Sequence, residues 1–390
     1  MRSHPAYPYL VRMLLASLVV VLIFQGIGMW RNMEFGSPGT VDFVQYWSAG
    51  QLLLQGKNPY DFDELYRIEV SLGLPDEVPV VMWNPPWLLL WILPLLFLPF
   101  KVAALGWLYL NLVLFLSCGT VIWRLLAPTQ ARRRIEVAWI ATLAFFPGLS
   151  AIRVGQMPTL VLVGVVGFLY CIVRDKPFLG GMFLVLTTIK PHLVYLLWIA
   201  VAWWVITERQ WKVAVGAGVT MVVSLGALTA ISPMSVAGYQ RALESPPLYW
   251  APATIGTTLR LLVFRNWPSV YYLPSVVGGL LFVGYLLTRR SRLNWRTALS
   301  PLLLGSVATA AYGWSFDHTV LLVPYLQIVA GLPGDELQMR VQQKRLIVAA
   351  LLSIGAIMVI GNRLRIPDYF FFWTPWALGA VYAYAQAAHR

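Results

Sequence analysis

The sequence predicts an all-α integral membrane protein that crosses the lipid bilayer many times. Of its 390 residues, 59% are hydrophobic and only 12% are charged, and the mean hydropathy is +0.69. Soluble domains carry about 25% charged residues, so a soluble fold of this size would leave too much apolar surface in water. Inside lipid, the long apolar runs must satisfy their backbone polar groups internally, as helices do. We expect one integral membrane domain over residues 1–390.

Apolar runs of roughly 20 residues, the length that crosses about 30 Å of hydrocarbon, recur throughout the chain. They cover residues 10–30, 102–126, 135–152, 157–173, 213–231, 271–288, 297–314, 346–361 and 370–388, with a shorter run at 319–333. The longer run 178–206 contains the sequence IKPH, and its Pro191 predicts two short helices separated by a break. We therefore expect about twelve membrane spans. Arg2 and Arg12 precede the first run, and no small-residue cleavage site follows, which favours a retained signal anchor over a removed signal peptide.

The segment Asn84–Phe100 is ambiguous, because it is apolar enough to cross the membrane but contains several prolines. Cytoplasmic loops carry an excess of Lys and Arg, so charge decides the path of this segment. If it does not cross, the basic sequences ARRR and TRRSRLNWR face the cytoplasm with both termini, and the outer loops carry balanced charge. If it crosses, every later loop inverts. We predict that Asn84–Phe100 is a re-entrant or interfacial helix, in a first external loop at residues 31–100 that also holds amphipathic helices.

Several function classes lack support in the sequence. The formal net charge of +13 is read as an orientation signal, because no Lys/Arg cluster interleaved with aromatic residues indicates nucleic-acid binding. Cys118 and Cys171 lie in apolar runs without a Cys or His partner at metal-binding spacing, so we interpret them as packing residues. A Gly-rich phosphate loop after a strand and a GxSxG nucleophile motif are also absent from the sequence. We expect no metal or cofactor, and a phosphate-bearing donor would arrive through the lipid.

The sequence TVDFVQYWSAG at residues 40–50 places an acid, Asp42, among aromatic residues at a membrane surface. The preceding turn makes Thr40 a good N-cap, so Asp42 is expected in the first turn of a short amphipathic helix, with Tyr46 one turn further on. Backbone amide donors and the positive helix end would keep the carboxylate ionised. Such a carboxylate suits a general base that removes a proton from a hydroxyl group. An acid that only improves helix capping is the alternative interpretation.

Cations beside the outer loops are candidates for binding a phosphate through charge-assisted hydrogen bonds. Arg153 ends an apolar run just before GQMP, Lys190 lies in the break at IKPH, and Arg260 and Arg265 flank the sequence LLVF. Long cationic side chains that reach from the membrane to the interface are the alternative. Lys190 stands out, because irregular backbone at membrane depth usually lines a cavity.

Asp317 and His318, in the sequence GWSFDHTVLLVP, lie where one apolar run ends and the next begins. An adjacent acid and imidazole at this depth are expensive to expose to lipid. Three interpretations remain open for them: they pair with each other, they form an interhelical hydrogen bond, or they bind a polar substrate.

Five sequence blocks occur in an order that resembles glycosyltransferase family 87, from about residue 40 to 325. They are DFVQYWSAGQLLLQGKNPYD, NPPWLLLWILPLLFLPF, GQMPTLVLVG, LGGMFLVLTTIKPHLVYLL and WSFDHTVLLVP. The family includes polyprenyl-phosphate-mannose-dependent α-mannosyltransferases of bacterial envelopes, with the C-type glycosyltransferase (GT-C) fold. The chain departs from the family pattern at Pro158, where Asn is common, and at Gly313-Trp314, where Ser-Trp is common. These departures bear on substrate choice more than on reaction type.

The resemblance implies an enzyme of the bacterial inner membrane that takes a sugar from a lipid-linked phosphosugar on the outer, periplasmic face. Asp42 matches the acid of the first external loop that serves as the catalytic base in such enzymes. Lys190 and His318 match positions that contact the donor phosphate or help to close the site, and Gln156 matches the family's Gly-Gln pair.

The sequence and the resemblance together predict an inverting, metal-independent glycosyl transfer to a membrane glycolipid or polysaccharide. Asp42 would be the base, and the donor phosphate or substrate would contact the set Lys190, His318, Arg153, Gln156, Asp317 and Tyr46. The rings of Tyr46 and Trp83 would stack on sugars, or alternatively anchor the chain at the interface. A transporter or flippase for a lipid-linked sugar is the competing function, and a non-catalytic scaffold is a further one.

Overall fold

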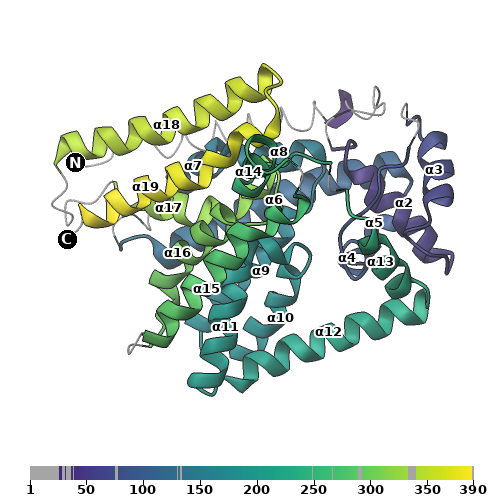
Figure 1. Cartoon of the computed structure of the whole chain (residues 1–390), viewed down its shortest axis with the longest axis horizontal. Helices are drawn as coiled ribbons and strands as arrows, with labels where there is room; N and C mark the ends of the chain where they lie inside the picture. Colours follow the sequence, from purple (N-terminus) through teal and green to yellow (C-terminus); the bar gives the residue numbers. More distant parts are fainter. Residues whose placement is uncertain are drawn as a thin grey trace.

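The computed structural model describes residues 39–74, 78–129, 134–247, 249–265, 267–288, 292–332 and 340–388, together with residues 26–28, 31, 37 and 131. These residues form helices and connecting turns without a β-strand, as the sequence predicts. Figure 1 shows a central bundle of helices, with the N-terminal helices at one end and the two C-terminal helices along one side. Most of the predicted span at 10–30 lies outside the described residues.

Four segments are long and apolar enough to cross a membrane. They are α6 (Phe100–Leu126), α12 (Trp211–Ile231), α18 (Val341–Arg363) and Ser269–Thr288, which contains α15 (Leu273–Thr288). A fifth candidate is the pair α7 (Ile135–Ala144) and α8 (Phe146–Val154), which is bent by 63°. The described residues therefore contain four or five candidate spans. These candidate spans indicate a membrane protein. The predicted number of about twelve spans is not confirmed.

The remaining apolar runs form shorter helices. They are α9 (Pro158–Val173), α10 (Pro177–Thr187), α11 (Tyr195–Thr207), α16 (Trp295–Ala308), α17 (Leu322–Gly331) and α19 (Thr374–Ala387). The run 178–206 divides as predicted, because α10 ends before the break and the 3₁₀ turn η2 (Pro191–Val194) precedes α11. The run 297–314 was predicted too long: its helix ends at Ala308, and the polar sequence that follows forms the 3₁₀ turn η4 (Ser315–Leu321).

The first external loop contains α2 (Phe43–Leu54), α3 (Phe62–Ser71), α4 (Leu88–Trp91) and α5 (Leu93–Leu96). The prediction of one helix at Asn84–Phe100 is wrong, because the prolines divide this segment into two single-turn helices. Side chains of α2 satisfy backbone carbonyls near these breaks: Trp47 donates to O of Leu98 over 3.0 Å, and Gln51 donates to O of Leu96 over 2.7 Å. Most residues of α2 are buried, so the predicted short amphipathic helix packs on more than one face.

Glycines bring α10 and α12 into backbone contact. A Cβ atom would lie only 2.0 Å from O of Val213 at Gly181 and 2.0 Å from O of Phe178 at Gly216. Small residues at such contacts let membrane helices pack closely. From this contact α12 runs to α13 (Ser235–Glu244), beside the first external loop (Figure 1).

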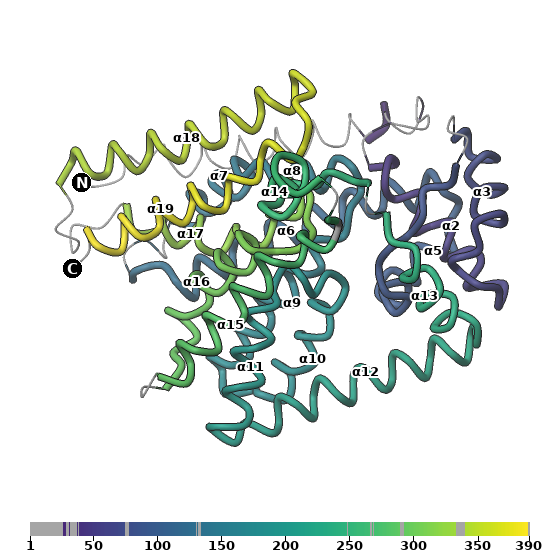
Figure 2. Tube along the Cα trace, in the orientation of Figure 1, coloured from purple at the N-terminus to yellow at the C-terminus, as the bar shows by residue number. Residues whose placement is uncertain are grey.

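The central helix α6 supports the end of α8, because Trp107 donates from Nε1 to O of Gly155 over 3.0 Å. Helix α8 in turn contacts η4, and η4 contacts both η2 and the C-terminal turn η5 (Asp368–Trp373). These contacts bring segments that are far apart in the chain into one region, next to α8 and α14 in Figure 2. Helix α14 (Ile255–Leu262) packs against η5 at the same end. The predicted chemistry-bearing residues lie mainly in this region.

Candidate active site

The C-terminal end of α8 holds the loop that carries Asp42. The amides of Gly39 and Asp42 donate to O of Arg153 and O of Val154 over 2.5 and 2.8 Å. These carbonyls belong to the last turn of a helix, where they lack helical partners, so the loop satisfies them. Gly155 has φ +84°, and a Cβ atom on it would lie 2.6 Å from O of Gly39. Only glycine permits this turn and this close contact.

Asp42 itself is the N-cap residue of α2, one position before the helix begins. The predicted cap, Thr40, instead donates its hydroxyl hydrogen bond to O of Ser37 over 2.7 Å. The carboxylate of Asp42 accepts no capping hydrogen bond from the amides of α2. The interpretation of Asp42 as a capping acid therefore has no support in the structure.

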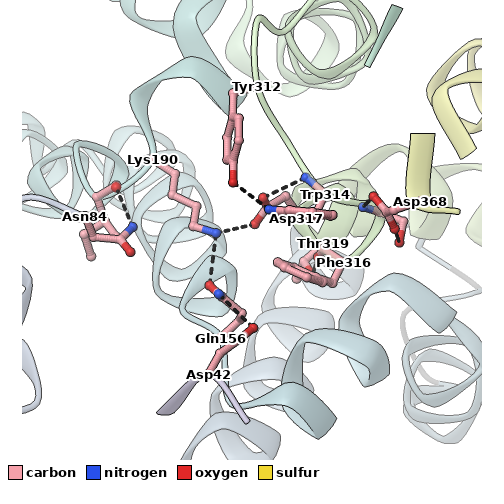
Figure 3. Close-up of polar contacts among 12 residues, drawn as sticks. Asp42, Asn84, Gln156, Lys190, Tyr312, Trp314, Phe316, Asp317, Thr319 and Asp368 are labelled. Carbon is pink, nitrogen blue, oxygen red and sulfur yellow. Dashed lines mark hydrogen bonds and ion pairs between the residues drawn. The ribbon is translucent and has the colours of Figure 1, made fainter. Parts of the chain in front are cut away.

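Gln156 connects Asp42 to Lys190. The side chain of Gln156 donates from Nε2 to Oδ2 of Asp42 over 2.9 Å, and its Oε1 accepts from Nζ of Lys190 over 3.1 Å (Figure 3). A lysine ammonium only donates, so Oε1 of Gln156 must face Lys190 and Nε2 must face the carboxylate. The hydroxyl of Tyr46 also donates to Oε1 of Gln156, over 2.8 Å, which agrees with this orientation. The amide of Gln156 is thus held as a donor to Asp42.

Lys190 forms a buried ion pair with Asp317, across 2.6 Å from Nζ to Oδ1. The exposed fractions of the two side chains are 6% and 0%. The second carboxylate oxygen of Asp317 accepts from the backbone amide of Trp314 over 3.0 Å, and the ring of Phe316 lies 5.4 Å from Nζ of Lys190. Removing either partner would leave the other charge buried and unpaired, which is strongly destabilising. Asp317 pairs with Lys190 and not with His318.

Burial raises the pKa of Asp42 above its ordinary value of 3.8. The hydrogen bond from Gln156 and the positive charge of Lys190 lower this pKa, and the negative charge of Asp317 raises it. The expectation that backbone amides keep the carboxylate ionised is therefore wrong, because the donor is a side chain. Asp42 as a residue remains partly exposed, whereas Phe43 and Val44 after it are buried.

Three other predicted site residues, Arg153, His318 and Tyr46, are not links in the hydrogen-bonded chain that runs from Asp42 to Asp317. Arg153 is exposed, and its guanidinium makes no hydrogen bond or ion pair with the described residues. His318 is buried, and burial lowers its pKa to about 4, so its imidazole is neutral near pH 7. Tyr46 is fully buried, so its ring has no access to a sugar and only its hydroxyl serves the site.

Two asparagines that the sequence argument did not single out complete the network. Asn84 donates from Nδ2 to O of Ile189 over 3.1 Å, which ties the first external loop to the break beside Lys190. Asn111 of α6 donates to the backbone O of Gln156 over 3.1 Å. Asn84 could have been singled out, because it starts the sequence NPPW. Asn111 lies within a long apolar run, and no neighbouring motif marks it.

Partly exposed aromatic rings stand next to the charged residues. The ring of Trp250 lies 6.2 Å from that of Trp83, 6.2 Å from that of Tyr312 and 6.0 Å from that of Trp314, measured between centroids. Its segment is fixed by Arg260, which donates to O of Trp250 over 3.0 Å. Three segments distant in sequence thus present aromatic surface at one place. The second predicted cation of that region, Arg265, lies in the turn after α14, is exposed, and donates to O of Leu261 in that helix.

Within the part of the chain that the structure describes, no group of three or more His, Cys, Asp or Glu side chains is arranged to hold a metal ion. What the site offers is a carboxylate beside a fixed amide donor, a buried ion pair and aromatic surface. A partly exposed carboxylate of this kind can accept a proton from a bound hydroxyl group.

Residues 83–324 match the family model described as glycosyltransferase family 87. This match includes Gln156, Lys190 and Asp317 but begins after Asp42, so it does not extend to the first block of the resemblance. No curated protein and no solved structure matches the chain significantly. The family match covers more than half of the sequence, and the chain therefore belongs to glycosyltransferase family 87 and is a membrane glycosyltransferase.

Proposed function

We propose that the chain moves a sugar, mannose by family resemblance, from a polyprenyl-phosphate donor to a membrane glycolipid or polysaccharide. The reaction takes place at the periplasmic face of the bacterial inner membrane, with both termini in the cytoplasm. The single observation that carries this proposal is the hydrogen-bonded chain from Asp42 through Gln156 and Lys190 to Asp317. It places a partly exposed carboxylate where burial and a fixed donor control its pKa, as general bases require.

The proposed reaction inverts the configuration of the sugar. Asp42 takes the proton of an acceptor hydroxyl, and the acceptor oxygen forms a bond to the anomeric carbon of the donor sugar. The bond from this carbon to the phosphate oxygen breaks on the opposite side, and its electron pair leaves with the polyprenyl phosphate. No metal or cofactor has a role in this proposal, since the lipid-linked donor is itself a substrate.

The phosphate that departs needs positive charge close to it. Arg153 is the best candidate, because its exposed guanidinium lies at the end of α8, three residues before Gln156. Lys190 already neutralises Asp317, so we assign it mainly to holding Gln156. His318 is neutral and would contribute a hydrogen bond rather than a charge. The rings of Trp83, Trp250 and Trp314 supply surface on which a sugar can stack.

The test uses the purified full chain in lipid vesicles with radiolabelled polyprenyl-phosphate mannose and a panel of membrane glycolipids. We expect the wild type to transfer label to an acceptor, and Asp42→Asn to abolish transfer while donor binding persists. Asp63→Asn, which changes an exposed acid of α3, is the matched control and should keep wild-type activity. Full activity of Asp42→Asn would remove Asp42 from the mechanism. Movement of intact donor between leaflets without transfer would instead indicate a flippase.

A further inference from the structure

A third carboxylate reaches the candidate site from the C-terminal segment. Asp368, at the start of η5, accepts hydrogen bonds from Ser315 through both oxygens: the hydroxyl donates to Oδ1, and the backbone amide donates to Oδ2 over 3.0 Å. Asp368 lies beyond residues 83–324, so the family match assigns it nothing.

The C-terminal segment is fixed in place by a small apolar cluster separate from the main core. Its buried members are Ala253, Met358 and Phe371, with Phe146 of α8 and Ile354 packed against them. This cluster joins α18, η5 and the start of α8. Helix α14, which follows Ala253 in the chain, also packs against η5. Asp368 is therefore held at η4 by packing as well as by its own hydrogen bonds.

Asp368 and Asp317 act on the same short turn. Asp317 accepts the backbone amide of Trp314, and Asp368 accepts the amide of the next residue, Ser315. These are the first amides of η4, which have no partner inside the helix. Figure 3 shows Asp368 and Lys190 on opposite sides of this turn, with Asp317 between them. Asp368 and Asp317 therefore bind adjacent amides of the turn from which Asp317 pairs with Lys190.

We propose that Asp368 is a positioning residue, which fixes the Trp314–Asp317 turn so that Asp317 holds Lys190 and, through it, Gln156 against Asp42. This inference rests on the proposed function of Asp42. Asp368 does not serve as a second base, because Ser315 already donates to both oxygens of its carboxylate. Its role is geometric, and the three acids of the site therefore have three separate tasks.

The experiment is a double-mutant cycle in the full chain with Asp368→Asn and Ser315→Ala, measured by steady-state transfer. We expect each single variant to lower kcat by about tenfold, as misplaced catalytic groups do, with the KM for the lipid donor within about twofold of wild type. The double variant should lose no more than the more severe single variant, because both changes break the same contact. Ser315→Thr retains the hydroxyl and should recover most of the activity.

Two outcomes would overturn the inference: wild-type kcat in Asp368→Asn, or a double variant whose loss is the product of the two single losses. The control Asp63→Asn should leave kcat and KM unchanged. Melting temperatures of the same variants test the contact without any activity: the double variant should melt no lower than the less stable single variant. If the wild type transfers no sugar, the proposed function fails, and the melting series still decides whether Ser315 and Asp368 are coupled.

Discussion

Gln156 donates a hydrogen bond of 2.9 Å from Nε2 to Oδ2 of Asp42. Burial raises the pKa of the Asp42 carboxylate, which favours its protonated form. The amide of Gln156 stabilises the charged form of Asp42, which is the form that accepts a proton. Lys190 and Tyr46 hold that amide in the required orientation.

Gln156→Leu is expected to shift the pH dependence of transfer. The hydrogen bond from Gln156 lowers the pKa of Asp42, so its loss raises that pKa. Because a base must be deprotonated, the acid side of the kcat profile should move to higher pH. The matched control is Gln51→Leu in α2. It removes a side-chain amide that donates to O of Leu96 and leaves the hydrogen bond of Asp42 in place. If the acid side of the kcat profile of Gln156→Leu has its midpoint at the wild-type pH, Gln156 does not lower the pKa of the catalytic base.

Lys190→Met and Asp317→Asn are each expected to destabilise the protein, because each leaves its partner's polar or charged group buried without its pair. Breaking such a pair costs about 3–5 kcal/mol, whereas replacing both partners costs much less. The double variant should therefore recover much of the lost stability in thermal unfolding while transfer remains impaired. Equal and additive destabilisation would mean that the two side chains are not paired.

Gly155→Ala is expected to displace the Asp42 loop. The φ of +84° disfavours any side chain, and a Cβ atom would meet both O of Gly39 at 2.6 Å and Cβ of Phe43 at 2.9 Å. We expect a lower melting temperature and a loss of transfer of at least tenfold, since a small misplacement of a catalytic group has effects of that order. Gly218→Ala in α12 is the control, because its Cβ atom would have nothing within 4 Å. Wild-type transfer in Gly155→Ala would show that the loop tolerates displacement.

The sidedness of the first external loop can be tested with single cysteines. The native Cys118 and Cys171 are buried and are first replaced by alanine. Cysteines are then introduced at the exposed positions Asp63, in α3, and Asp175, in the turn after α9. If the basic loops face the cytoplasm, a membrane-impermeant maleimide added to spheroplasts should label position 63 and not position 175. The reverse labelling would place Asp42 on the cytoplasmic side and exclude a periplasmic site.

The sequence alone indicated the properties that depend on residues close together in the chain. Hydropathy predicted a helical membrane protein, Pro191 predicted the break that follows Lys190, and the polar residues Asp42 and Asp317 stood out against apolar surroundings. The prolines of Asn84–Phe100 also signalled an unusual segment, although they divide it more completely than expected. The number of spans depends on where helices end, and local hydropathy did not determine those ends.

Only the tertiary structure decided which polar groups act together. The bond between Asp42 and Gln156 joins residues 114 positions apart, and the pair of Lys190 and Asp317 joins residues 127 positions apart. Such contacts depend on how α2, α8, η2 and η4 pack together. No local sequence pattern indicates which of these elements will meet. Packing also left Arg153 exposed, enclosed the ring of Tyr46 and brought Asp368 to the site. The sequence supplied the reactive groups, and the folded arrangement determined their partners because a buried charge is stable only where another group compensates it.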